Sequence, residues 1–318
     1  MEHQSKAAPL IRLGTRGSKL ALAQAHETKR RLGEAHAELA PDDAVEIVVI
    51  KTTGDKVQDR ALAEIGGKGL FMKEIEAALT ERRIDIAVHS LKDVETFLTE
   101  GTELAAILPR EDPRDALISR VANSIEDLPK GAIIGTASVR RAAQLLNKRP
   151  DFKIILYRGN LETRLRKLDE GVCDATMLAI AGLSRLGLAD KATRVLEPEE
   201  LLPAVSQGAI GVQCRSGKKN GDKRILDWVH GINDKDSNIR VTAERAMLAR
   251  LDGSCRTPIA GLAELLPGGK LRLRGQLAAL DGSALYSAEE VGSVDDPAAL
   301  GLAVGEALIA QAGPDYKV

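Results

Sequence analysis

The sequence has few aromatic residues and almost no net charge. Phenylalanine, tryptophan and tyrosine make up 2% of the 318 residues, so the chain lacks the aromatic platforms on which single-stranded nucleic acids stack. Its 45 lysines and arginines are nearly balanced by 46 aspartates and glutamates, which leaves a formal net charge of −1. The chain is therefore not a nucleic-acid polycation, and an anion site must come from a local cluster of cations.

Cysteine is scarce, and long apolar runs are absent. The three cysteines, Cys173, Cys214 and Cys255, are odd in number and far apart, which excludes a disulfide framework and a CxxC metal pattern. The first residues contain no apolar core of a signal peptide, and no segment is apolar over the length that crosses a bilayer. We therefore expect a protein of the reducing cytoplasm, with no metal site and no membrane partner.

Nucleotide-binding fingerprints are missing as well. The glycine-rich segment 66–69 contains Lys68, but a P-loop requires serine or threonine after the lysine, and here Gly69 follows. No Gly-x-Gly-x-x-Gly sequence is present either. The segment instead predicts a loop from which Lys68 can reach a neighbouring crevice.

Two segments, beginning near Ile11 and Ala132, resemble each other. Each has a short apolar run, a Gly-Thr pair, a serine and an alanine- and leucine-rich stretch with helical spacing. Ser18 in the first and Ser138 in the second can each cap a helix N-terminus, where backbone N–H groups and the helix dipole favour an anion. Because arginine, which binds carboxylates and phosphates in a forked geometry, accompanies both turns, the pair predicts a duplicated domain with a ligand between the copies.

Strands and helices alternate along the first two-thirds of the chain, which indicates βαβ units and parallel sheets. The first set of predicted strands and helices comprises strands at 10–14, 45–51 and 84–89 and helices at about 18–33 and 68–82. After a polar crossing at 110–115, the second set comprises strands near 132–135, 153–157 and 174–179 and helices near 139–148 and 161–170.

The pattern changes at about residue 231. A helix is predicted at 238–251 and a last helix near 297–312. Between them, Pro-Gly-Gly at 267–269 and Asp-Gly at 281–282 favour hairpins between strand-like runs. The C-terminal part is therefore expected to be a small α+β domain with an antiparallel sheet.

Polar side chains follow the predicted strands, at the carboxyl ends where open parallel sheets bind ligands. The cations and hydroxyls that gather there are Arg16, Ser18, Lys92, Thr136, Ser138, Arg140, Arg141, Arg158, Arg164 and Arg185. So many arginines around one crevice, in a chain without net positive charge, predict a polyanionic ligand. The alternative is that the arginines at 140, 141, 164 and 166 form a solvated helix face.

Asp93 is the candidate acid or base. A carboxylate at the mouth of an arginine-lined crevice would repel an anion rather than bind it, but it can transfer protons. Two alternatives stay open for Asp93, a helix cap and a salt bridge to Lys92. The nearby His89 is more simply interpreted as a packed residue at a strand end than as a catalyst.

Cys255 is the cysteine whose position favours reaction. It lies in a tight loop and precedes Arg256, whereas buried cysteines are usually inert small hydrophobic residues. Cys173 and Cys214 lie in or beside apolar runs and are expected in the core.

With these residues assembled, the chain resembles the porphobilinogen deaminase (hydroxymethylbilane synthase) family from about Ile11 to the last helix. The motifs match in order and spacing: Gly14-Thr15-Arg16, 66–71 (GGKGLF), 89–93 (HSLKD), 110–115 (REDPRD), 158–160 (RGN), 181–187, 206–209 (SQGA) and Gly253-Ser254-Cys255.

The resemblance implies two sheet domains like those of periplasmic binding proteins, with a ligand crevice between them, and a small C-terminal α+β domain. Domain 1 is expected at 1–108 together with 209–227, to which the chain returns. Domain 2 is expected at 114–203 and domain 3 at 231–318. The family also implies a monomer.

The implied activity belongs to tetrapyrrole biosynthesis. Four porphobilinogen molecules are joined head to tail, each loses ammonia, and water releases the linear product, hydroxymethylbilane. In this family a cysteine, by position Cys255, holds a dipyrromethane cofactor built from the substrate through a thioether. Asp93 would protonate the leaving amine, stabilise the positive azafulvene and pyrrole intermediates, and later help to remove a ring proton.

Every pyrrole carries an acetate and a propionate, so the resemblance assigns the cations of the chain to these carboxylates. Besides Cys255, the residues implied to bind the cofactor and growing chain are Arg16, Ser18, Lys68, Lys92, Thr136, Ser138, Arg140, Arg141, Arg158, Arg164, Arg185 and Gly208. Two positions depart from the family pattern: Glu64 stands where some members have lysine, and Ser254 makes the common Gly-Gly-Cys into Gly-Ser-Cys.

Two other classes of function remain as alternatives to the transferase. A solute-binding module of the same two-domain type would need the anion crevice but no cysteine loop. A nucleic-acid binder is opposed by the net charge and the scarcity of aromatic residues.

Overall fold

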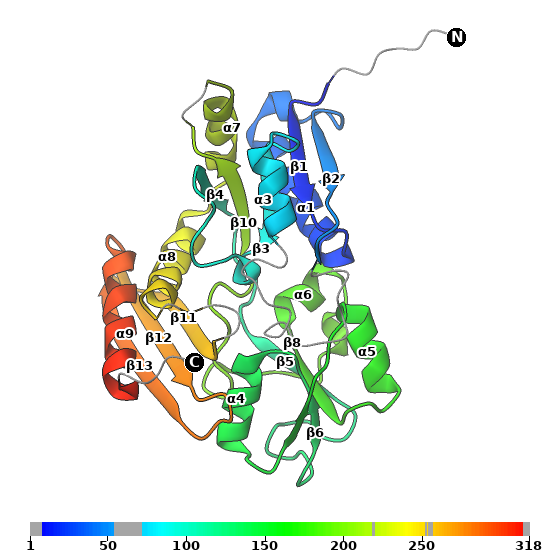
Figure 1. Cartoon of the computed structure of the whole chain (residues 1–318), viewed down its shortest axis with the longest axis vertical. Helices are drawn as coiled ribbons and strands as arrows, with labels where there is room; N and C mark the ends of the chain where they lie inside the picture. Colours follow the sequence, from blue (N-terminus) through cyan, green and yellow to red (C-terminus); the bar gives the residue numbers. More distant parts are fainter. Residues whose placement is uncertain (1–7, 54–71, 218–219, 252, 254–256, 314–318) are drawn as a thin grey trace.

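The computed structural model describes residues 8–53, 72–217, 220–251, 253 and 257–313. These residues form two α/β sheet domains, one above the other in Figure 1, and a third domain of helices and an antiparallel sheet beside them. The predicted fold class is therefore confirmed.

The first sheet has the strand order β2-β1-β3-β10-β4. Its strands are β1 (Ile11–Thr15), β2 (Val45–Val49), β3 (Ile86–Ser90), β4 (Thr102–Ile107) and β10 (Ile210–Arg215). β1 runs parallel to β2 and β3, while β10 runs antiparallel to β3 and β4. The central strands consist mainly of buried aliphatic residues, because helices cover both faces of the sheet.

The second sheet repeats this plan in the order β7-β6-β8-β5-β9. Its strands are β5 (Asp115–Ser119), β6 (Ile133–Gly135), β7 (Lys153–Ile155), β8 (Ala175–Ala179) and β9 (Arg194–Val195). β6 is parallel to β7 and β8, and β5 is antiparallel to β8 and β9. The chain passes from the first sheet to the second just before β5 and returns just before β10. These two connections lie side by side, because the Glu111 N–H of one donates to the Gly208 carbonyl of the other.

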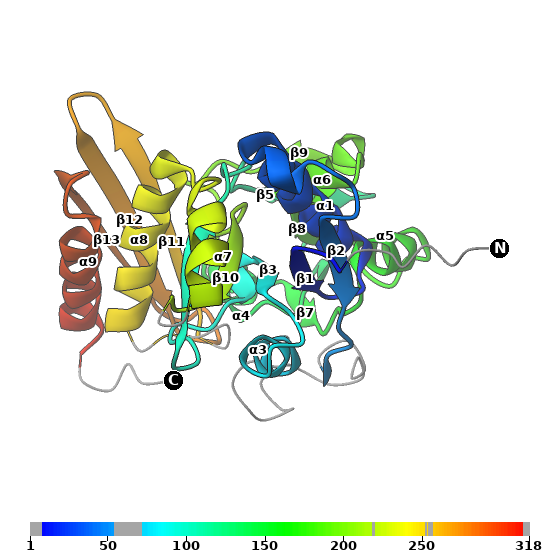
Figure 2. The ribbon, with the colours of Figure 1, turned by 90° about the horizontal axis from the view of Figure 1, so that it is seen from above.

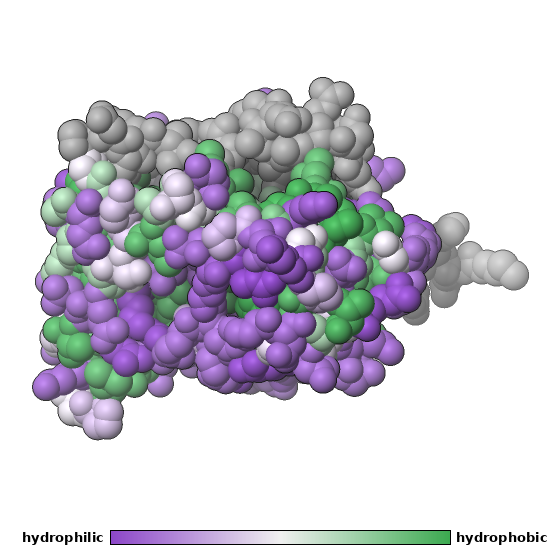
Figure 3. All heavy atoms as spheres, turned by 90° about the horizontal axis from the view of Figure 1, so that it is seen from below, coloured by the Kyte–Doolittle hydropathy of each residue, from purple (hydrophilic) through white to green (hydrophobic). Residues whose placement is uncertain are grey.

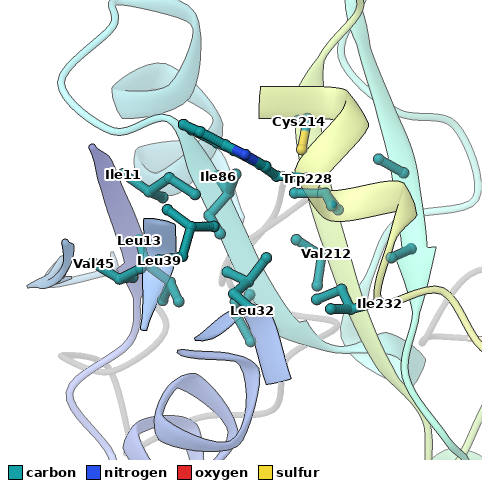
Figure 4. Close-up of a cluster of buried hydrophobic side chains, with 14 of the residues drawn as sticks. Ile11, Leu13, Leu32, Leu39, Val45, Ile86, Val212, Cys214, Trp228 and Ile232 are labelled. Carbon is teal, nitrogen blue, oxygen red and sulfur yellow. The ribbon is translucent and has the colours of Figure 1, made fainter. Parts of the chain in front are cut away.

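Helices flank both sheets. Those of the first domain are α1 (Lys19–Ala35), α3 (Lys73–Thr80) and α7 (Asn220–His230), and those of the second are α4 (Val139–Lys148), α5 (Leu161–Asp169) and α6 (Ile180–Arg185). On one face of the first sheet, Leu32 of α1 and Trp228 of α7 join Ile11 and Leu13 of β1 in a single buried cluster (Figure 4). A separate cluster around Ile75 of α3 fills the other face.

The third domain contains α8 (Lys235–Arg250), β11 (Ile259–Leu266), β12 (Lys270–Ala278), β13 (Leu285–Ser293) and α9 (Pro297–Ala312). Its strands form the antiparallel sheet β11-β12-β13, and both predicted hairpins are present. Met247 of α8 and Val304 of α9 share one buried cluster with Leu273 of β12, so the two helices pack against the same sheet (Figure 2).

Several element boundaries differ from the prediction. The helix expected at 238–251 begins at Lys235 because Asp234 caps it. The strand expected at 84–89 is Ile86–Ser90, and Asp85 just before it accepts hydrogen bonds from the backbone and side chain of Arg12. The helix expected at 68–82 is observed at Lys73–Thr80, with 68–71 outside the described residues.

The face of the molecule seen from below is mostly hydrophilic, with hydrophobic residues in several separate areas (Figure 3). In the part of the chain that the structure describes, no helix has both the length and the apolar character to span a bilayer.

Candidate active site

Two serine-capped helix N-termini lie at equivalent places in the two sheet domains. Ser18 follows β1, and its side chain accepts a hydrogen bond from the backbone N–H of Ala21 in α1 (3.3 Å). Ser138 follows β6 and accepts one from the backbone N–H of Arg141 in α4 (3.4 Å). The buried Thr136 accepts from the backbone N–H of Ser138 (3.1 Å). The matched turns are therefore present, and both end in helix N-termini that favour an anion.

A third capped N-terminus lies beside the second sheet. Asn160 caps α5 by accepting from a backbone N–H in the first turn. Arg158 is buried just before it, and Arg164 donates from Nε to the carbonyl of Gly159 (2.9 Å). Burial, and next the charge of Arg141, lower the pKa of Arg164 to about 10. The arginines of α4 and α5 therefore lie within electrostatic range of each other.

A pocket of about 80 Å³ lies at the carboxyl ends of β1 and β3. Its polar lining comprises Arg16, Ser18, Gln24, His89, Ser90 and Asp93. The strands are parallel, so the segments that follow them meet at one edge of the sheet. The structure thus brings together Arg16, Ser18 and Asp93, as the sequence predicted.

Asp93 is exposed at the edge of this pocket, in the turn η2 (Leu91–Asp93) that follows β3. Within the described residues its carboxylate accepts no hydrogen bond and forms no ion pair, so neither the helix cap nor the salt bridge to Lys92 is observed. Burial lowers the pKa of both Lys92 and Arg164, and the charge of Asp93 acts in the opposite direction on each. Asp93 is therefore within electrostatic range of cations from both sheet domains.

His89 lines the same pocket but is a packed side chain. Its Nε2 lies 3.1 Å from Oε1 of Gln213 in β10, and burial lowers the pKa of His89 to about 4. The imidazole is therefore neutral at physiological pH, in agreement with the interpretation of His89 as a packed strand-end residue.

Lys92 turns toward the passage between the domains. Its Nζ donates to Oε1 of Gln207 (3.1 Å). Burial, and next the charge of Arg141, lower the pKa of Lys92 to about 8. A bound carboxylate would relieve this accumulation of positive charge.

Arg140 and Arg141 are buried at the start of α4, so the solvated-face alternative is wrong for them. Arg140 donates to the carbonyl of Leu202 and to the carboxylate of Asp115, both at 2.7 Å. Arg141 donates to the carbonyl of Met177 (2.8 Å) and to the other oxygen of Asp115 (2.7 Å).

Arg140 and Arg141 each have one N–H donor without a hydrogen-bond partner in the described residues. The Nε atoms of Arg140 and Arg141 are buried and have no acceptor within the described residues. Buried donors are rarely left without a partner, so these two are candidates for contact with an acceptor of a ligand. Arg166, in contrast, is exposed and pairs with Glu170, as a solvated helix face requires.

Arg185 and Gly208 meet where the chain returns to the first sheet. Arg185 donates to the carbonyl of Gly208 (2.9 Å) and lies 3.6 Å from the carboxylate of Glu27 on α1. Gly208 has a φ of 88°, and a Cβ there would lie 2.4 Å from the carbonyl oxygen of Glu111. Gly208 therefore contributes through its backbone, at a place where only glycine fits.

Some predicted positions lie outside the described residues, namely Glu64, Lys68, Ser254 and Cys255. Cys173 and Cys214 are buried, as predicted, and burial raises the pKa of each thiol. Both are therefore poor nucleophiles.

The sequence analysis missed two residues of this region, Asp115 and Gln207. Both are almost completely buried. They belong to the matched motifs at 110–115 and 206–209, but the polar, proline-containing character of 110–115 suggested only a crossing between domains. These two motifs are the sequence features from which Asp115 and Gln207 could have been identified.

Comparison with known proteins gives one family for the whole chain. Residues 11–223 match the family model "Porphobilinogen deaminase, dipyromethane cofactor binding domain", and residues 238–310 match "Porphobilinogen deaminase, C-terminal domain". The porphobilinogen deaminase of Paracoccus denitrificans is 56% identical over 306 residues, which cover 96% of either chain. The chloroplastic porphobilinogen deaminase of Oryza sativa is 52% identical over 317 residues, covering 99% of this chain and 87% of that one.

Similarity to solved structures is weaker. A substrate-binding domain of a putative amino acid ABC transporter from Streptococcus pneumoniae is 14% identical with a TM-score of 0.42, covering 75% of this chain and 97% of that one. The sulfate-bound regulatory domain of OxyR2 from Vibrio vulnificus is 14% identical with a TM-score of 0.40, covering 70% and 93%. The sheet topology therefore remains the basis for the fold class. The two family models and the identities with the bacterial and plant relatives show that this chain belongs to the porphobilinogen deaminase family.

Proposed function

We propose that the pocket at β1 and β3, together with the arginines of the second sheet domain, forms the active site in which four porphobilinogen molecules are condensed. The enzyme of this family, hydroxymethylbilane synthase, acts in tetrapyrrole biosynthesis. The observation that carries the assignment of residues is the position of Asp93. Within the described residues it is a carboxylate without hydrogen-bond or ion-pair partners, and its charge acts on Lys92 of the first sheet domain and Arg164 of the second.

The cations suit a ligand with many carboxylates. A dipyrromethane carries an acetate and a propionate on each ring, so its binding site must offer many N–H donors. The unpartnered Nε atoms of Arg140 and Arg141 meet this requirement, and so do the helix N-termini capped by Ser18 and Ser138. When bound, the cofactor supplies the pyrrole end from which the chain is extended.

The residues that we assign to the carboxylates of cofactor and growing chain come from both sheet domains and from the return between them. They are Arg16, Ser18, Lys92, Thr136, Ser138, Arg140, Arg141, Arg158, Arg164, Arg185 and Gly208. Lys68 would add one more cation. Gly208 would act indirectly, because its carbonyl holds Arg185.

The carboxylate of Asp93 would act as a general acid and then as a general base. It would supply the proton that leaves with ammonia, balance the positive charge that then develops on the substrate, and take up the ring proton released when the carbon–carbon bond forms. The proton given is thus recovered in each cycle. Since it has no structural partner within the described residues, Asp93 keeps its oxygens available for this task.

Cys255 is proposed as the attachment point of the cofactor through a thioether. The burial of Cys173 and Cys214 supports this choice, because neither thiol is accessible. Free cysteines also fit a reducing compartment, and we propose a cytoplasmic monomer. The strand pairings support a domain 1 at 1–108 with 209–227, a domain 2 at 114–203 and a domain 3 at 231–318.

Intact-mass measurement combined with an ammonia assay tests this function. The purified protein should exceed the sequence mass by two pyrrole units and release ammonia from porphobilinogen. A protein that has the sequence mass and leaves porphobilinogen unchanged would contradict the proposal.

A further inference from the structure

Asp115 is the most completely enclosed carboxylate near the site. It is the first residue of β5 and is 0% exposed. It accepts hydrogen bonds from Arg140 (2.7 Å), Arg141 (2.7 Å) and the side-chain amide of Gln207 (2.8 Å). One carboxylate therefore contacts three side chains from two separate segments.

Gln207 extends this contact into the first sheet domain. Its Oε1 accepts from Nζ of Lys92 (3.1 Å), while its amide nitrogen donates to Asp115 and to the carbonyl of Pro113 (2.8 Å). Gln207 itself is 1% exposed, and the buried Asp115 is one of the three partners that fix this orientation. A continuous chain of hydrogen bonds thus runs from Lys92 through Gln207 and Asp115 to the two arginines of α4.

Asp115 stays charged in this position. Burial by itself would raise the pKa of Asp115, but Arg140 and Arg141 outweigh it and hold that pKa well below its usual range. The three cations of the cluster would repel one another without a buried anion. With one carboxylate and three cations the cluster has a net positive charge, and a carboxylate of a ligand can neutralise it.

We propose that Asp115 is a positioning residue for the condensation: it holds Arg140 and Arg141 and, through Gln207, Lys92, as one preformed cradle for ligand carboxylates that spans both sheet domains. This inference rests on the proposed assignment of these cations to the cofactor and growing chain. Preorganised donors bind more tightly because less ordering is left to the binding step.

Asp115→Asn tests the inference because it keeps the shape and removes the charge. The amide keeps one acceptor oxygen, so one of the two arginines loses its hydrogen bond to this side chain and keeps only its backbone carbonyl partner. We expect KM for porphobilinogen to rise about 10- to 100-fold, as for the loss of a hydrogen bond to a charged group. We also expect a lower fraction of purified protein with the cofactor mass.

The alkaline limb of the plot of kcat/KM against pH is a second readout. A purely structural role of Asp115 would leave the position of this limb unchanged. The charges acting on Lys92 are Arg141, Asp93, Asp115 and Arg140, and Asp115 is one of the two that raise its pKa. Lys92 must be protonated to bind a carboxylate. Removing the charge of Asp115 should therefore move the alkaline limb to lower pH.

Asp222→Asn is the matched control. Asp222 is also a buried carboxylate held by two arginines, Arg82 and Arg215, but none of the three lines the pocket. It should lower the melting temperature and leave KM, cofactor mass and the alkaline limb unchanged.

Gln207→Met provides a second test that leaves the pair of arginines on Asp115. It removes the hydrogen bonds of Gln207 to Lys92, Asp115 and the carbonyl of Pro113, and with them the connection between Lys92 and Asp115. KM should therefore rise several-fold, and the alkaline limb should again move to lower pH. If Asp115→Asn fails to fold, this variant decides alone. Wild-type KM and an unmoved limb in the folded variants would overturn the inference, whereas a wild-type protein without ammonia release or cofactor mass would overturn the proposed function itself.

Discussion

The charged Lys92 lowers the free energy of unfolding of the protein, and the substitution Lys92→Met should raise it. Burial, and next Arg141, lower the pKa of Lys92 from 10.5 to about 8. At pH 7 the folded state therefore disfavours the protonated lysine by roughly 3 kcal/mol relative to the unfolded chain. The substitution also removes the hydrogen bond to Gln207, and this loss cancels about 1 kcal/mol of the gain in unfolding free energy. We expect a net gain of about 1–2 kcal/mol.

The pH dependence gives this prediction its sign. Between about pH 8 and 10.5 the unfolded lysine binds a proton that the folded one has released, so this group makes the wild type more stable as the pH rises. The advantage of Lys92→Met should therefore be full at pH 7 and fade toward pH 10. Urea unfolding at both pH values measures it, best in the Cys255→Ser background, where no cofactor carboxylate should neutralise Lys92. A variant less stable than its parent at pH 7, or a gain that is equal at both pH values, would refute the reasoning.

Two further predictions concern the cofactor. Cys255→Ala and Cys255→Ser should give folded, inactive protein at the sequence mass, since the described cysteines are buried; normal turnover or an unchanged mass adduct would exclude Cys255 as the attachment point. Arg140→Leu and Arg158→Leu should impair cofactor assembly or chain binding. Arg140→Leu should also destabilise the fold, by less than the roughly 3–5 kcal/mol of a fully broken buried pair, because Asp115 loses one of its two arginines and keeps Arg141. Near-normal activity and cofactor occupancy in both variants would place these arginines outside the site.

The local signals in the sequence predicted much of the fold. The helices at 139–148 and 297–312 are observed at those bounds, because Ser138 and Asp296 cap them and Pro297 starts the second. The two hairpins follow from glycines with positive φ at 268, 269 and 282. Such features depend on residues that are neighbours in the chain, so they can be recognised without the tertiary structure.

The strands contributed by distant segments were not predicted. β5 begins with Asp115 in a segment that is polar and contains proline, and its neighbours in the sheet, β8 and β9, lie about 55 to 80 residues further along the chain. The burial of Asp115 likewise depends on Arg140, Arg141 and Gln207, and no local pattern indicates that they converge. The sequence located the candidate site residues, but their partners required the fold.

Asp93→Asn tests the central claim most directly, with single-turnover ammonia release and thermal unfolding measured on the same protein. The amide is nearly isosteric and, within the described residues, breaks no hydrogen bond or ion pair, so the melting temperature should stay at the wild-type value. Ammonia release should slow by at least about 10²–10⁴-fold, as expected for the loss of a general acid and base, and Asp93→Glu should retain intermediate activity. Fast ammonia release from a destabilised Asp93→Asn protein would contradict the account.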